Sequence, residues 1–170
     1  NAKIAFSNNN GDTWTDVPNS FQGLGYDFKL IQSFGTDTLI ISTNQPYLVT
    51  TYDNGLSWNL VNNGGATDNT AMYFSNSMTG FTGTSIGEIY STIDGGTNWS
   101  LELQTNGNDP VNCIKFTDPL NGWFFAGNET YRTANGGSVW GKEINPSKAP
   151  LYDIDFLVGN NALAVGDGLS

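Results

Sequence analysis

The sequence predicts an all-β fold built from one repeated unit of roughly 40 residues. The first observation is an eight-residue motif, S/T-x-D/N-x-G-x-x-W, that occurs four times in the 170 residues. The second is a set of tripeptides, each ending in a large apolar residue, that recurs in step with this motif. The third is that no stretch keeps the 3.6-residue apolar spacing of a helix. Units of this length hold four short strands, the usual size of a β-propeller blade.

The two periodicities agree in length. The third positions of the motif, at residues 9, 53, 94 and 135, are 44, 41 and 41 residues apart. The tripeptides at 79–81, 121–123 and 161–163 are 42 and 40 residues apart, and a Phe lies five positions before each of them. Because two registers coincide, we interpret residues 1–170 as one repeat domain. The motif copies occupy 7–14, 51–58, 92–99 and 133–140.

Each unit divides into four strands separated by Gly, Asn or Asp. In the third unit we expect strands at 70–75, 79–84, 87–93 and 98–103. In this phase the chain begins on the third strand of a unit, at residues 2–7. Its last predicted strand, at residues 162–166, is the second strand of a unit.

Two ring arrangements are compatible with this phase. Two N-terminal and two C-terminal strands together make one further blade, so four complete blades result if the termini pair. Counting from Asn135 through the C-terminus and on to Asn9 gives 44 residues, which matches the repeat. Such closure removes the open edge of a sheet. The alternative is that the chain forms part of a larger ring.

The repeated motif predicts a turn that is capped by its own side chains. The Asp or Asn at the third position can accept hydrogen bonds from backbone N–H groups one or two residues later. The Gly at the fifth position supplies a positive φ, and the Trp starts the next strand and packs in the core. Asn9 and Asn135 lack the carboxylate charge, so we expect weaker turns there. The residues with these structural roles are Asn9, Gly11, Trp14, Asp53, Gly55, Trp58, Asp94, Gly96, Trp99, Asn135, Gly137 and Trp140.

The four motif copies resemble the Asp-box, or bacterial neuraminidase repeat, which implies a hairpin between the third and fourth strands of a propeller blade. The stretch 121–127 leading into 131–137 is similar to a narrower group, the propellers related to the photosystem II assembly and stability factor. That group is common among bacterial secreted proteins. The resemblance implies a fold and leaves function open, because the same turn occurs in sialidases, xyloglucan hydrolases, sortilin-type receptors and non-catalytic modules.

Composition excludes several classes of function. Six basic residues face 16 acidic ones, for a net charge of -10, which disfavours binding to nucleic acid and to anionic membranes. There is no His, so no site can depend on one. Cys113 is the single cysteine and is expected to be a buried, inert thiol. Arg132 is the single arginine, whereas a sialidase requires three. No apolar run approaches the length of a membrane-spanning helix, so we expect no membrane insertion.

The loops between units, together with the turns between second and third strands, should share one face opposite the motif turns. Loops of a propeller usually carry its function. The expected loops are 18–26, 62–68, 104–111 and 145–150, with turns at 43–46, 84–87 and 127–129. Their amides, aromatics and acids suit a protein or a glycan partner. The candidate ligand contacts are Phe21, Gln22, Tyr26, Asn44, Gln45, Tyr47, Asn106, Asp109, Asn128 and Glu129.

Asp153 and Asp155 offer the one acidic pair that could support catalysis. Their i, i+2 spacing places both on the axis side of a first strand, and glycosidases use two carboxylates across a cleft. We favour the alternative that they are solvated residues lining the channel. Asp53 and Asp94 could suggest calcium ligands, but the further acids of a calcium loop are missing, so turn capping is favoured. We expect neither a metal nor a cofactor.

These observations favour a non-catalytic binding or scaffold module that recognises a protein or a carbohydrate through its loop-rich face. Composition, with 22 Asn and 21 Gly, is typical of a secreted or cell-surface protein. We therefore expect an extracellular or envelope location. The alternative function is a glycoside hydrolase, or a piece of one, that uses Asp153 and Asp155. The identity of the ligand and the oligomeric state stay open.

Overall fold

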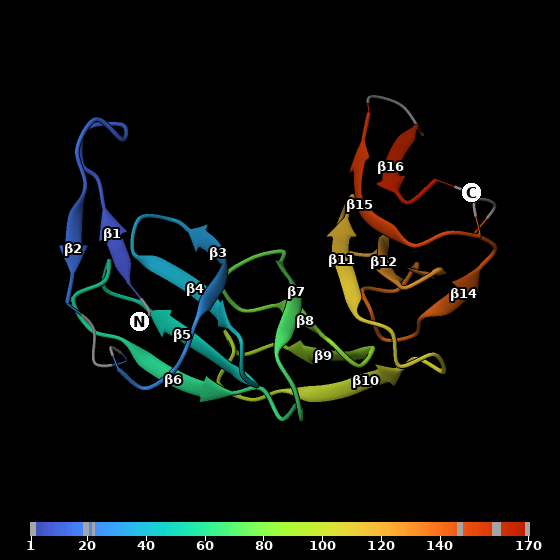
Figure 1. Ribbon diagram of the computed structural model, residues 1–170, viewed down its shortest axis with the longest axis horizontal. Coiled ribbons are helices and arrows are strands. Elements are labelled where there is room, and N and C mark those ends of the chain that lie inside the picture. Colours follow the sequence, from blue (N-terminus) through green and yellow to red (C-terminus); the bar gives the residue numbers. More distant parts are fainter. Residues whose placement is uncertain (1–2, 19–20, 22, 146–147, 158–160, 169–170) are drawn as a thin grey trace.

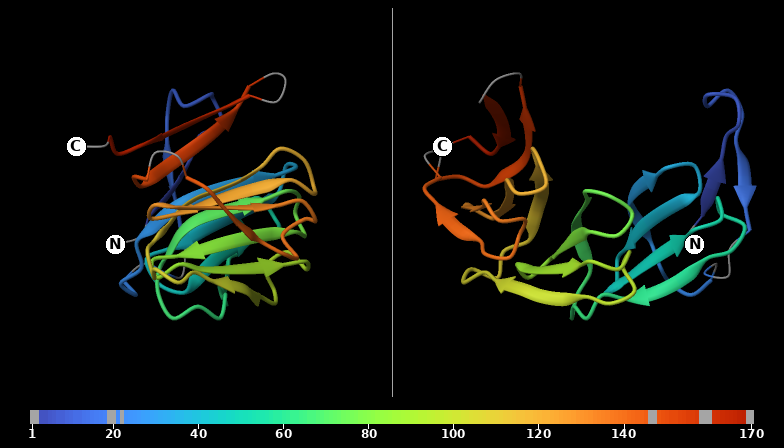
Figure 2. Two further views of the ribbon diagram at one scale, coloured as in Figure 1. Left: turned by 90° about the vertical axis from the view of Figure 1, so that its right-hand side faces the viewer. Right: turned by 180° about the vertical axis from the view of Figure 1, so that it is seen from behind.

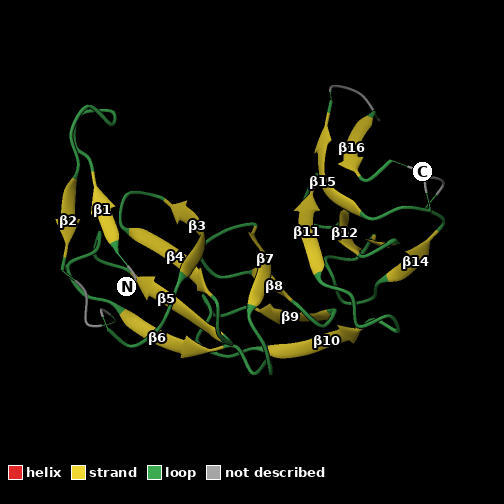
Figure 3. Ribbon diagram, in the orientation of Figure 1, coloured by secondary structure: helices red, strands yellow, loops and turns green. Residues whose placement is uncertain are grey.

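The computed structural model describes residues 3–18, 21, 23–145, 148–157 and 161–168. This part of the chain consists of strands joined by turns and loops, without helices (Figure 3). Accordingly, no helix there is long and apolar enough to cross a membrane. The all-β prediction is confirmed.

The described strands form five antiparallel sheets, and the strands of each sheet follow one another in sequence order. The four-stranded sheets comprise β3 (Phe28–Phe34), β4 (Thr38–Thr43), β5 (Tyr47–Thr51) and β6 (Asn59–Asn62); β7 (Asn69–Phe74), β8 (Gly80–Thr84), β9 (Glu88–Thr92) and β10 (Ser100–Gln104); and β11 (Val111–Phe116), β12 (Gly122–Ala126), β13 (Glu129–Thr133) and β14 (Gly141–Glu143). The two-stranded sheets comprise β1 (Ile4–Phe6) with β2 (Thr15–Val17), and β15 (Leu151–Phe156) with β16 (Ala162–Gly166). The strands predicted for the third unit thus correspond to β7–β10, with ends shifted by one or two residues.

The five sheets stand side by side in an open arc (Figure 1). The first strands of successive sheets, β3, β7, β11 and β15, line the concave side and contact one another. The last strands, β6, β10 and β14, lie on the convex side, and the other views show the same arrangement (Figure 2). A central axis therefore runs along the concave side of the arc.

The two terminal sheets remain separate from each other. By the phase of the repeat, β1 and β2 are a third and a fourth strand, while β15 and β16 are a first and a second strand. The expected pairing between them is not formed in the described residues, because the two hairpins stand on opposite sides of the opening of the arc (Figure 1).

The core lies between adjacent sheets and inside each sheet. Phe124 and Val111 are fully buried, and they belong to a cluster that joins the β7–β10 sheet to the β11–β14 sheet. Trp140 packs edge-on against this cluster, with ring centroids 5.0 Å from Phe124, 5.8 Å from Phe116 and 6.0 Å from Phe81. These edge-to-face contacts suit the charge distribution of aromatic rings. The motif tryptophan therefore packs its own sheet against the preceding one.

Trp14 does not follow this pattern. Trp58, Trp99 and Trp140 are half-buried and pack against core clusters, as predicted. Trp14, in contrast, is 64% exposed, so its expected place in the core is corrected. The reason is that, in the part of the chain that the structure describes, its sheet consists of β1 and β2, and no first or second strand covers the ring there.

The motif turns, which we call the box turns, are capped by two side chains. In the third copy, the N–H of Asn98 donates to Asp94 Oδ1 (2.9 Å), and the N–H of Gly96 donates to Thr92 Oγ1 (2.9 Å). The Asp thus caps the N–H four residues later, which corrects the expected reach of one or two residues. The expected positive φ is confirmed at the fifth position, where Gly96 has φ 89°. The fourth position is also left-handed, and Asn54 there has φ 57°.

A polar side chain at the seventh position of the motif makes a second bond with the third-position residue in three of the four box turns. In the first copy, Asn9 Nδ2 donates to Thr13 Oγ1 (2.8 Å). Asp53 accepts from both the N–H (2.8 Å) and the hydroxyl (2.6 Å) of Ser57. The hydroxyl and N–H of Ser57, with Thr51, lower the pKa of Asp53 to about 2. Asn135 Oδ1 still accepts from the N–H of Val139 (3.0 Å). The apolar side chain of Val139, however, has no atom that could bond to Asn135 Nδ2. The weaker turns at Asn9 and Asn135 stay predictions; Asn135 has one bond fewer, whereas Asn9 keeps both.

Cys113 lies on β11 and is buried. Burial, together with the neighbouring charge of Asp153, raises the pKa of its thiol to about 12. A thiol with such a pKa holds almost no thiolate at neutral pH. This environment agrees with the expectation of an inert, buried cysteine.

Candidate functional site

The loops between sheets and the turns between second and third strands lie on one face, which we call the loop face. The N–H of Ser85, in a turn between second and third strands, donates to the carbonyl of Asp68 in the preceding inter-sheet loop (3.2 Å). The box turns lie at the other end of the strands, where the N–H of Gly95 donates to the carbonyl of Met78 (2.8 Å). The two faces predicted from the strand order are therefore present.

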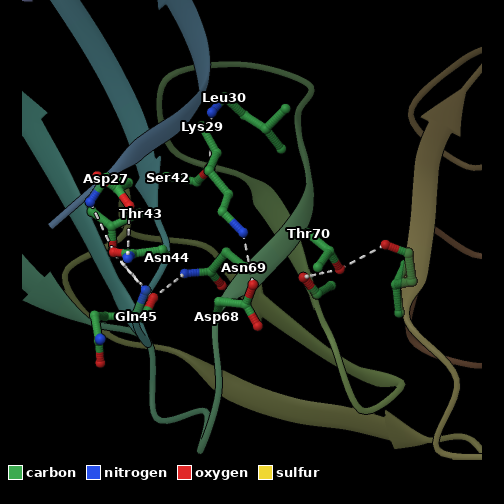
Figure 4. A network of polar contacts seen from close by, with 12 residues as sticks. Asp27, Lys29, Leu30, Ser42, Thr43, Asn44, Gln45, Asp68, Asn69 and Thr70 are labelled. Atoms are coloured by element: carbon green, nitrogen blue, oxygen red, sulfur yellow. Dashed lines mark hydrogen bonds and ion pairs between the residues drawn. The ribbon is translucent and has the colours of Figure 1, made fainter. Parts of the chain in front are cut away.

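A polar network joins the first two four-stranded sheets on the loop face (Figure 4). The N–H of Asp27 donates to Asn44 Oδ1 (2.9 Å), and Asn44 Nδ2 donates back to Asp27 Oδ2 (3.3 Å). Lys29, on β3, donates from Nζ to Asp68 Oδ2 (2.8 Å), just before β7. Burial opposes the ionisation of Asp68, but its hydrogen bonds, including the one from Lys29, hold the pKa of this carboxyl below its ordinary value.

Asn69 anchors the backbone beneath this network. Its side chain is fully buried and donates to the carbonyls of Gln45 (3.1 Å) and Tyr47 (3.2 Å), as Figure 4 shows for Gln45. It also accepts from Asn63 Nδ2 (2.6 Å). The main chain that presents Asn44 and Gln45 is consequently fixed from below, while the Gln45 side chain is exposed.

The first strands are joined by polar contacts that sequence reasoning missed. Thr70 Oγ1 donates to the carbonyl of Val111 (2.7 Å), and Asn112 Nδ2 donates to the carbonyl of Leu151 (2.8 Å). Each donor lies four residues before the Phe that ends its first strand, Phe74 or Phe116. Lys29 lies five residues before Phe34, so it occupies the preceding repeat position. Polar residues at one repeated position were the available signal. They indicate that this position connects neighbouring sheets.

The predicted ligand contacts form two groups, apart from Phe21 and Gln22. Tyr26 and Tyr47 form an edge-to-face pair (5.7 Å, 72°) next to Asn44 and Gln45. Phe21 is 5% exposed and packs on the core beside the first four-stranded sheet, so its expected ligand contact is corrected. A segment rich in Gly and polar residues suggested an exposed ring, but the ring covers that core. The candidate Gln22 lies outside the described residues.

The second group lies at the junction of the next two sheets. Asn106, Asp109 and Asn128 are exposed there, and the Asp109 carboxylate lies against Gly127. Glu129 is engaged: it forms an ion pair with Lys142 and accepts from the hydroxyl of Tyr131 (2.6 Å). Those bonds lower the pKa of Glu129. The predicted residues thus form two patches along the loop face, one at each junction.

Asp153 and Asp155 are both exposed on β15, as expected for residues that line the channel. They open into different hollows, however. Asp153 lines a hollow of about 280 Å³ with Asn112 and Lys115. The Nζ of Lys115 lies 3.8 Å from Asp153 Oδ1. Asp155 lines a second hollow of about 940 Å³ with Trp123. The two carboxylates therefore do not converge on one cleft.

The surface has a large excess of negative charge. Of the 16 acidic side chains, four form ion pairs with lysines in the described part of the chain: Asp16, Asp68, Glu129 and Asp153. Arg132 makes none there, and its guanidinium lies 5.3 Å from the centre of the Trp123 ring. Among the described residues, no group of three or more His, Cys, Asp or Glu could hold a metal ion.

Comparison with known proteins identifies the fold to which this arc of sheets belongs. No family model matches the chain, and no curated protein matches it. Solved structures do. YCF48 from Cyanidioschyzon merolae superposes with a TM-score of 0.71 at 15% identity, over 96% of this chain and 60% of its own. YCF48 bound to D1 peptide gives 0.74 at 19% identity, over 99% and 55%. The fold is a β-propeller.

A third similar structure is that of an enzyme. The crystal structure of an ancestral GH74 enzyme superposes with a TM-score of 0.74 at 15% identity, over 88% of this chain and 22% of its own. The chain thus spans little more than half of the YCF48 chains and about a fifth of this enzyme. At these identities the likeness concerns the propeller fold, and a propeller can serve binding or catalysis.

Proposed function

We propose that this propeller is a non-catalytic module that binds a protein partner with basic side chains at its loop face. The observation that carries the proposal is the patch of Tyr26, Tyr47, Asn44 and Gln45, whose main chain is fixed by buried hydrogen bonds. A surface that is already ordered loses little entropy when a partner binds. Paired tyrosines and amides are common at the centre of such interfaces.

Charge favours a protein over a glycan as the partner. With a net charge of -10 and most carboxylates outside ion pairs, the surface attracts cationic groups over a distance of about 8–10 Å in physiological salt. Lysine and arginine side chains supply such groups, whereas common glycans are neutral or acidic. YCF48, a propeller with the same fold, has been solved with a bound peptide, which supports a peptide-like partner here.

The test is a binding screen with arrays of 12-residue peptides and of glycans. We expect binding to peptides that contain several Lys or Arg, weakened at least several-fold in 0.5 M NaCl. Gln45→Ala should weaken this binding by about fivefold, because it removes one direct hydrogen bond at the interface. Asn59→Ala, an exposed amide on the convex strand β6, is the matched control and should have no effect. Salt-insensitive glycan binding without peptide binding would contradict the proposal.

The alternative function, a glycoside hydrolase, is supported by the likeness to the GH74 propeller. It requires Asp153 and Asp155 to act together, although they line different hollows. Turnover of a glycan that is lost in Asp153→Asn would establish the enzyme. Glycan binding that this substitution leaves unchanged would support the non-catalytic module.

An extracellular or envelope location is part of the proposal. The composition supports it, with 22 Asn, 21 Gly and only six basic residues. Fractionation of the source cells with an antibody against the chain tests it. Recovery in the cytoplasmic fraction alone would contradict this location.

A further inference from the structure

We propose that Asn106, in the loop that joins β10 to β11, is a site of spontaneous deamidation, which the fold selects from six Asn–Gly pairs (Figure 1). Deamidation converts the side-chain amide into a carboxylate and requires water as its only reactant. Glycine in the next position favours the reaction, because a residue without a Cβ does not hinder its own main-chain nitrogen. This inference goes beyond the proposed function and does not depend on it.

The chemistry requires a main-chain N–H that is free to react. The glycine nitrogen forms a bond to Cγ of the Asn side chain, and the side-chain amide leaves as ammonia, together with the proton that the glycine N–H loses. The resulting five-membered succinimide is opened by water at either carbonyl, which gives aspartate or isoaspartate. A glycine N–H that already donates a hydrogen bond, or an Asn side chain held by its own bonds, must first give up those bonds. Hydrogen bonds at an Asn–Gly pair therefore protect it.

Three of the six pairs lie in box turns, where the glycine N–H is engaged. In the second copy, the N–H of Gly55 donates to Thr51 Oγ1 (2.9 Å), and the N–H of Gly11 makes the corresponding bond in the first copy (2.9 Å). In the fourth copy, the N–H of Gly136 donates to the carbonyl of Leu120 (2.9 Å). The Asn residues of all six pairs are Asn10, Asn54, Asn63, Asn106, Asn121 and Asn135.

Two further pairs are held by other bonds. Asn63 is fully buried, and the N–H of the following Gly64 donates to Asn62 Oδ1 (2.7 Å). Asn121 Nδ2 donates to both carboxylate oxygens of Asp118 (3.2 and 2.9 Å). Each of these five pairs thus has at least one hydrogen bond that must break before the glycine nitrogen can attack.

The pair of Asn106 and Gly107 has no such protection. Both residues are exposed, and neither the Gly107 N–H nor the Asn106 side chain forms a hydrogen bond with any residue that the structure describes. The loop is anchored at its two ends, where the N–H of Thr105 donates to the carbonyl of Gly87 (2.9 Å) and the carbonyl of Pro110 accepts a bond of 3.3 Å. The segment between these anchors can rearrange at a low free-energy cost, because few bonds oppose it.

Deamidation would change the charge of the loop face. Asn106 is one of the residues predicted from the sequence to contact a ligand, and each event adds one negative charge to the net charge of -10. The carboxylate of Asp109 lies close by, since a Cβ built on Gly107 would be 2.8 Å from Asp109 Oδ2. The loop would then present two exposed carboxylates, which strengthens the attraction of this face for cationic groups.

The test is incubation of the purified 170-residue chain in a mildly alkaline buffer without ammonium salts, followed by proteolytic digestion and tandem mass spectrometry. The peptide that contains Asn106 should gain about one dalton, and isoaspartate methyltransferase should label it. We expect this reaction to be at least about tenfold faster than at the other five pairs, the factor that corresponds to one hydrogen bond of about 1.4 kcal/mol. In concentrated urea, which removes the protection, the six rates should become similar.

Two variants separate the site from its surroundings. Asn106→Gln keeps an exposed amide, but its longer side chain would have to close a less favourable six-membered ring, so the mass gain should disappear. Ser7→Ala removes the acceptor of the Gly11 N–H and should make Asn10 react at least several-fold faster, while Asn54, whose turn is unchanged, keeps its rate. Equal rates at all six pairs of the folded chain, an Asn106 that stays intact where the urea-unfolded chain reacts, or an unchanged Asn10 in Ser7→Ala would overturn the proposal.

Discussion

Trp14 and Trp140 occupy the same motif position, yet their removal should change stability by very different amounts. Trp140 contacts three aromatic rings, and burying such a ring against a rigid core is worth about 3–5 kcal/mol. Its Nε1 is buried without a hydrogen-bond partner among the described residues, which offsets part of this gain. We therefore expect Trp140→Ala to lower the free energy of unfolding by about 3 kcal/mol. Trp14→Ala should lower it by less than about 1 kcal/mol, because most of the ring is in water.

The assay is urea unfolding followed by far-ultraviolet circular dichroism, which does not depend on tryptophan fluorescence. It is run at low micromolar concentration. With an m-value of about 2 kcal/mol/M, Trp140→Ala should shift the midpoint by about 1.5 M. Equal shifts for both variants would refute the reasoning, since the ring would then act through its own hairpin and not through the adjacent sheet.

Three further substitutions test other parts of the fold. Gly80→Ala places a Cβ 2.3 Å from the Phe74 ring, and because this ring is buried, we expect a loss of about 1–3 kcal/mol in urea unfolding. Gln32→Ala removes the paired bonds between its amide and the backbone of Phe74 (2.8 and 2.9 Å), and hydrogen exchange of the Phe74 amide should become at least several-fold faster. Asp53→Asn tests how the stability of the fold depends on pH. The folded pKa of Asp53, about 2, lies below its ordinary 3.8, so its contribution is present above pH 3.8 and is lost as the pH falls towards 2. Unfolding measured between pH 5 and 2 should show a smaller loss of stability in the Asn variant, and an unchanged pH dependence would contradict this assignment.

Local features of the fold could be predicted from the sequence because the same turn residues occur in all four copies of the motif. The strand boundaries and the positive φ of Gly96 follow from turn residues at fixed spacing. The reach of Asp94 to the N–H of Asn98 could not be derived, because it depends on two consecutive left-handed residues. The sequence shows Asn or Gly at the first of them, and either residue is also common in other turns.

Contacts between sheets were less accessible to sequence reasoning. The bond from Lys29 to Asp68 joins residues 39 positions apart, and no local pattern specifies such a pair. Phe21 was misplaced for a related reason: its neighbours form a polar, Gly-rich loop, but a core cluster lies beneath its ring. The curvature of the arc depends on inter-sheet packing such as that of Phe81 against Phe116. A spacing of 41 residues is compatible with rings of different size, so the repeat length alone cannot predict closure.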